Sequence, residues 1–101
     1  MTQSSPDELG LLLHEHLASC VEFSEEAWDL EVPVLDAELV GIIVAFLECP
    51  PEPISAMGSV IAARAERLRC VERVLPRKSE QRHVRRLLAM GDIIMDRISP
   101  H

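Results

Sequence analysis

The stretch from Asp36 to Glu48, DAELVGIIVAFLE, decides the fold class of this 101-residue chain. On a helical wheel, Leu39 and Ile43 share one face, while Val40 and Val44 cover much of the other. An element that is apolar nearly all round is a central, buried one. Four of its residues are β-branched, so a strand is the competing interpretation. Its length, the acidic cap at its first residue and the helical segments around it favour a helix.

Three other segments repeat apolar residues at helical spacing, which predicts helices over residues 6–30, 55–75 and 79–98. Ser79 is the expected cap of the last of these, and Ser55 of the one before it. The inward stripe of the last helix is expected to be Val84, Leu87, Leu88, Gly91, Ile94 and Ile98. Glycine inside a helix costs about 1 kcal/mol relative to alanine, so we expect it there to allow a close helix contact.

These segments predict an all-α fold, a small antiparallel four-helix bundle in which residues 1–101 form a single domain. Its four helices would cover residues 6–30, 36–48, 55–75 and 79–98. The proline-rich run from Cys49 to Pro53 would link the second helix to the third.

Charge is divided unevenly along the chain. Residues 1–63 hold twelve carboxylates and no Lys or Arg, whereas residues 64–101 hold ten basic and five acidic side chains. The net charge of −7 argues against nucleic acid or an anionic membrane as a partner. In the predicted bundle, the acidic end of the first helix and the basic start of the last lie at the same end.

Partner binding is therefore expected on the charged surfaces. The candidate residues are Glu15, Glu22, Glu25, Glu26 and Asp29 on the acidic side and Arg82, Arg85 and Arg86 on the basic side. Two interpretations of the basic stretch 77–86 stay open. It binds an anion, or it pairs with the first helix.

Two short motifs resemble metal sites. His14 and His16 stand two positions apart, so on a helix their rings point about 200° apart and cannot share an ion. Glu80 and His83 have the Glu-x-x-His spacing of di-iron bundles, but a second such pair is missing. We therefore predict no metal and no cofactor.

Arg77 and His83 enclose five residues near the start of the last helix. This pattern resembles the Arg-x(4–6)-His motif of HEPN-type ribonucleases, which are also helical bundles. The polar residue that usually follows the arginine is here Lys78. The resemblance implies an alternative function, a HEPN-like ribonuclease that cleaves RNA with Arg77 and His83 at a dimer interface.

The composition favours a small bacterial protein of the cytoplasm. The first ten residues lack a basic signal-peptide region, and the run Leu39–Leu47 is too short to span a membrane. The three cysteines include no close pair, as expected in a reducing compartment. We predict a non-enzymatic protein-interaction module of the regulator, chaperone or immunity type. Its excess of aliphatic residues predicts a homodimer.

Overall fold

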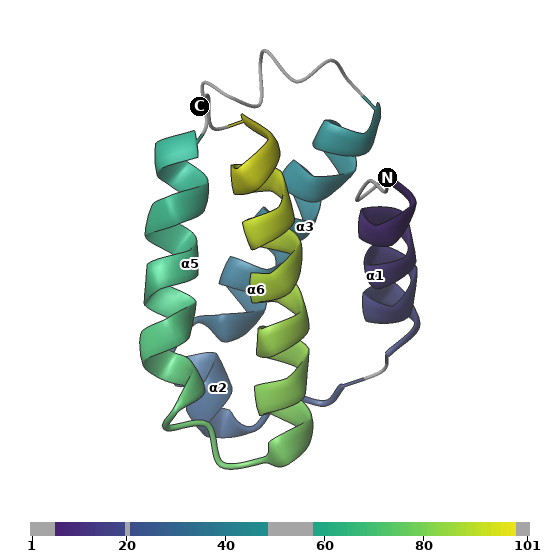
Figure 1. Cartoon of the computed structure of the whole chain (residues 1–101). Coiled ribbons are helices and arrows are strands. Elements are labelled where there is room, and N and C mark those ends of the chain that lie inside the picture. Colours follow the sequence, from purple (N-terminus) through teal and green to yellow (C-terminus); the bar gives the residue numbers. More distant parts are fainter. Residues whose placement is uncertain (1–5, 20, 49–57, 99–101) are drawn as a thin grey trace.

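The computed structural model describes residues 6–19, 21–48 and 58–98, and these form five α-helices and no β-strand (Figure 1). The helices are α1 (Pro6–Ala18), α2 (Glu25–Asp29), α3 (Val32–Glu48), α5 (Gly58–Glu72) and α6 (Lys78–Ile98). The all-α prediction is confirmed for this part of the chain, and residues 36–48 are helical.

The helix α3 is the central element, because it contacts each of the other four described helices. It buries Val32, Leu35, Leu39 and Ile43, which recur every three or four residues and so form one face. The neighbouring α5 and α6 lie side by side and run in opposite directions (Figure 1). The expected central position of this segment is confirmed.

The predicted first helix over residues 6–30 is wrong, since the chain leaves the helix after Ala18 and forms a second, short helix, α2. Ser24 begins α2 as its N-cap, with its hydroxyl accepting a 3.2 Å hydrogen bond from the Ala27 backbone N–H. Leu17 continues the four-residue apolar spacing of Leu9 and Leu13, yet its side chain is 61% exposed. The described residues therefore form five helices where four were predicted.

The second predicted helix begins four residues earlier than expected, at Val32. Glu31 separates it from α2 and adopts a left-handed backbone conformation, with φ of 65°, and its carbonyl accepts the Leu35 N–H at 3.0 Å. Pro33 lies in the first turn of α3, where backbone N–H groups have no helical partner, so its missing N–H is tolerated. Asp36 is consequently in the second turn and is not a cap.

The last helix begins at Lys78, so the predicted cap Ser79 is already inside it and is exposed. The carbonyl of Arg77 accepts the N–H of Gln81 at 3.1 Å, and the carboxylate of Glu80 reaches back to the Arg77 N–H at 3.4 Å. This is the glutamate half of a capping box. The expected cap Ser55 and the expected linker 49–53 lie outside the described residues.

The core is formed by aliphatic side chains from all five helices. On α6, Val84, Leu87, Leu88, Gly91 and Ile94 are buried, as predicted. A β-carbon added at Gly91 would meet its nearest neighbour on another element, the Ile61 Cγ2 atom, at 3.9 Å, an ordinary van der Waals distance. The expected close helix approach at this glycine is therefore absent. Among the described helices, none combines the length and the apolar character needed to cross a membrane.

Candidate functional site

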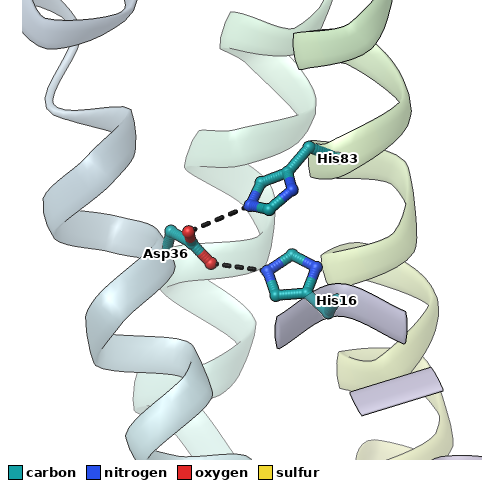
Figure 2. Close-up of polar contacts among 3 residues, drawn as sticks. All are labelled: His16, Asp36 and His83. Atoms are coloured by element: carbon teal, nitrogen blue, oxygen red, sulfur yellow. Dashed lines mark hydrogen bonds and ion pairs between the residues drawn. The ribbon is translucent and has the colours of Figure 1, made fainter. Parts of the chain in front are cut away.

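Three helices bring one carboxylate and two imidazoles together in the interior of the fold (Figure 2). Asp36 projects from α3 toward His16 of α1 and His83 of α6, which lie next to each other on its far side. The Nε2 atom of His16 lies 2.7 Å from Asp36 Oδ1, and the Nε2 atom of His83 lies 3.0 Å from Asp36 Oδ2. We call these three residues the His–Asp–His cluster.

Both imidazoles of the cluster are buried, with His16 only 3% and His83 only 5% exposed. The two rings stack with their centroids 3.9 Å apart, and Phe23 packs edge-on against His83 at 5.6 Å. Polar side chains in such a place need partners, because an unpaired polar group in the interior costs free energy. The shared carboxylate is that partner.

Burial acts to raise the pKa of Asp36, because it disfavours the charged carboxylate. The hydrogen bonds from His16 and His83, together with the charges of the two rings, outweigh burial and lower the pKa from 3.8 to about 2. The carboxylate is therefore ionised at neutral pH and acts only as an acceptor. It follows that both Nε2 atoms facing it carry protons and donate them.

The other ring nitrogen of each histidine, Nδ1, is buried and has no hydrogen-bond partner within the described residues. Among the described residues, no group therefore binds Nδ1 and so determines which ring nitrogen carries the proton. The tautomer of each ring is set by Asp36 alone.

Glu80 lies beside the cluster in sequence, one helical turn before His83 on α6, and it is completely buried. Its carboxylate accepts the Ser24 backbone N–H at 2.6 Å and the Arg77 N–H at 3.4 Å. Glu80 thus ties the start of α2 to the start of α6. Its role is structural. Despite the Glu-x-x-His spacing, the Glu80 carboxylate and the His83 ring bind different partners.

The cluster offers one nitrogen from each histidine and a carboxylate oxygen, and these three atoms all lie within 4.8 Å of one another. Two imidazoles and a carboxylate are ligands of Zn²⁺ and other divalent transition metals. Sequence reasoning missed this group, because it searched for ligands within single helices and assigned Asp36 a capping role. The prediction that His14 and His16 point in different directions is confirmed, since His14 is exposed while His16 is buried.

A second candidate is the acidic surface at α2, which we define as Glu22, Glu25, Glu26 and Asp29. All four residues are exposed, and none of their carboxylates makes a hydrogen bond or an ion pair with the described residues. Trp28 lies among them on α2 with 59% of its surface exposed. Its position three residues after Glu25 places the indole and that carboxylate on one side of the helix.

Two of the three basic candidate residues form ion pairs with other described residues, unlike the residues of the acidic surface. Arg85 pairs with Glu72, and Arg86 lies 4.0 Å from Glu15 of α1. Arg82 is exposed and makes no ion pair with the described residues. The predicted charged residues therefore meet at one contact between α1 and α6, Glu15 with Arg86, while the acidic surface is left unneutralised.

The two residues of the HEPN-like motif have different partners. The Arg77 guanidinium donates to the backbone carbonyl of Glu22 at 3.0 Å, whereas the His83 ring is buried against His16 and Asp36. RNA cleavage requires both side chains to reach a phosphate group. This geometry gives the ribonuclease alternative no support.

The chain matches no protein-family model, no curated protein and no solved structure. Its function is therefore inferred from the two candidates above.

Proposed function

We propose that this chain is a small helical protein-interaction module that binds a Lys- and Arg-rich segment of another protein through the acidic surface at α2. The observation that carries the proposal is Trp28, a large aromatic side chain that is 59% exposed among carboxylates without partners in the described residues. Tryptophan is enriched among the residues that dominate binding energy at protein interfaces.

The chemistry of the surface selects a basic partner. The face of an indole attracts Lys and Arg side chains by cation–π interaction, which contributes about 0.5 to 2 kcal/mol. Carboxylates around the ring add hydrogen bonds to the same cations, and they speed association at low salt. An acidic or apolar partner would leave Glu25, Glu26 and Asp29 without compensation.

The homodimer predicted from the sequence belongs to the same proposal, with a second copy as the partner. Arg82 makes no ion pair with the described residues and lies on α6, so a two-fold dimer would bring two such arginines to two acidic surfaces. Sedimentation at micromolar concentration tests this directly. A monomer at low and high salt would remove the dimer and leave a different basic protein as the partner.

The experiment is a titration followed by the fluorescence of Trp28, the one tryptophan of the chain. An Arg- and Lys-rich peptide is expected to shift its emission, while a Glu-rich peptide of equal length leaves it unchanged. Calorimetry on Trp28→Ala should show at least a roughly 10-fold loss of peptide affinity. The triple variant Glu25→Gln, Glu26→Gln, Asp29→Asn should lose both affinity and its dependence on salt.

The matched control is Leu11→Ala, because Leu11 of α1 is 66% exposed and lies outside the acidic surface. It should bind the peptide as the unmodified protein does. Equal binding by the unmodified protein, the Trp28 variant and the triple variant would exclude the acidic surface as the binding site.

A further inference from the structure

The His–Asp–His cluster has a second chemical use beyond joining three helices. We propose that it binds one divalent transition-metal ion, with Zn²⁺ as the reference ion, through His16, Asp36 and His83. The proposal is independent of the protein-binding function, because His16 and His83 are buried and Asp36 is half-buried, whereas the acidic surface at α2 is exposed.

The distances are close to those that a metal ion requires. Zn²⁺ binds imidazole nitrogen and carboxylate oxygen at about 2.0 to 2.2 Å, so neighbouring ligand atoms in a tetrahedral site lie roughly 3.3 Å apart. The two N–O distances here are 2.7 Å and 3.0 Å, and the three ligand atoms lie within 4.8 Å of one another. Widening these two N–O distances by roughly 0.6 Å and 0.3 Å would replace the two hydrogen bonds by metal–ligand bonds.

The proton balance is simple. A histidine ligand is neutral, so Nε2 must lose the proton that it now donates to Asp36. In a neutral ring that proton moves to Nδ1 and none is released, whereas a charged ring, which already carries a proton on Nδ1, releases one proton to solvent. Because neither Nδ1 has a partner in the described residues, this shift breaks no other hydrogen bond.

The donor set also determines the class of ion. Two imidazoles and one carboxylate suit Zn²⁺, Co²⁺, Ni²⁺ and Fe²⁺, whereas Mg²⁺ and Ca²⁺ prefer oxygen ligands and higher coordination numbers. Three protein ligands leave one position of a tetrahedral ion for water or an outside group.

A bound ion would hold α1 to the rest of the fold. His16 belongs to α1, whereas Asp36 and His83 belong to α3 and α6, the two helices against which α1 packs. A ligand that binds only the folded chain raises its stability, so metal binding should raise the melting temperature. It should also protect α1 from proteolysis.

The test uses the full chain, stripped of metal with a chelator and titrated with Zn²⁺ or Co²⁺ alone. Calorimetry should show one ion per chain, and Zn²⁺ should raise Tm by several degrees. The visible absorption of Co²⁺ should show a four-coordinate nitrogen and oxygen site, without the intense band of cobalt bound to cysteine sulfur. Each of His16→Gln, Asp36→Asn and His83→Gln should weaken binding by about 100-fold or more.

The matched controls are His14→Gln and Glu38→Gln. The first changes an exposed imidazole two positions from His16, and the second changes an exposed carboxylate two positions from Asp36. Both should bind metal as the unmodified protein does. If the cluster variants fail to fold, NMR of the unmodified protein decides: Zn²⁺ should shift the ring protons of His16 and His83 and leave those of His14 in place. Absence of one-to-one binding, a sulfur-ligated cobalt spectrum or unchanged affinity in folded cluster variants would overturn the proposal.

Discussion

The backbone N–H of Ser24 donates a 2.6 Å hydrogen bond to the carboxylate of Glu80, a residue 56 positions further along the chain. Both residues are buried, and each lies at the start of a helix. The contact therefore fixes where α2 begins relative to the first turn of α6. The chain leaves the helical conformation after Ala18, and this contact lies at the end of that break.

Replacing Glu80 should destabilise the fold more than replacing any exposed glutamate. Glu80→Ala leaves the N–H groups of Ser24 and Arg77 without their acceptor, which we expect to cost about 2 to 3 kcal/mol of unfolding free energy. Glu80→Gln keeps an acceptor oxygen and should cost about half as much. Urea unfolding measures both. Glu66→Ala, at an exposed position of α5, should stay within about 0.5 kcal/mol of the unmodified protein, and an equal loss there would contradict the assignment.

The two serines that precede acidic residues should respond differently to alanine. Ser24→Ala removes the hydroxyl that accepts the Ala27 N–H and should cost about 1 kcal/mol. Ser79→Ala removes an exposed hydroxyl inside the first turn of α6 and should change stability by less than about 0.5 kcal/mol. Thermal unfolding of the two variants side by side distinguishes them. A larger loss for Ser79→Ala would show that α6 begins after Ser79, as the sequence predicted.

The sequence predicted the parts of the fold that depend on local periodicity. The buried stripe of α6 from Val84 to Ile94 follows from the spacing of its apolar residues, and so does the helical conformation of residues 36–48. The break after Ala18 could not be predicted in this way, because apolar residues recur at helical spacing beyond it, at Phe23, Ala27 and Leu30. The contact of Ser24 with Glu80 comes from a distant part of the chain.

The His–Asp–His cluster was missed for a related reason. Its residues are separated by 20 and 47 positions, so no short motif contains them. An aspartate before an apolar run also predicts a helix cap, and that interpretation concealed the role of Asp36. One usable signal was present: His83 stands four residues before Leu87, on the buried face of a helix whose stripe was correctly identified.

Alanine at Gly91 should stabilise the protein. The residue is buried in the middle of α6, and a β-carbon there would meet the Ile61 side chain at 3.9 Å, which is normal contact. Helix propensity alone favours alanine by about 1 kcal/mol. Gly41→Ala in α3 is the comparison, because it gains the same propensity with no atom of a neighbouring element within 4 Å of its β-carbon. Chemical unfolding should show both variants more stable than the unmodified protein; a less stable Gly91→Ala would mean that α5 and α6 approach more closely than described.

The stability of the metal-free protein should depend on pH through Asp36. The two histidines hold its pKa at about 2 in the folded state, below the ordinary value of 3.8. A lowered carboxylate pKa contributes stability that is fully present above pH 3.8 and is lost as the pH falls toward 2. The contribution is at most about 2 kcal/mol, because the residue keeps some contact with water, which screens its charge.

The measurement is urea unfolding with a chelator present, comparing the unmodified protein with Asp36→Asn between neutral pH and pH 2. The difference in unfolding free energy between the two should be largest at neutral pH and should narrow as the pH drops below 3.8. Glu38→Gln provides the reference at neutral pH, since it removes a largely exposed ion pair with Arg64 and should cost less than about 1 kcal/mol. If the gap for Asp36→Asn stays constant down to pH 2, hydrogen bonding to a neutral group is sufficient at this position, and the charge of Asp36 does not stabilise the cluster.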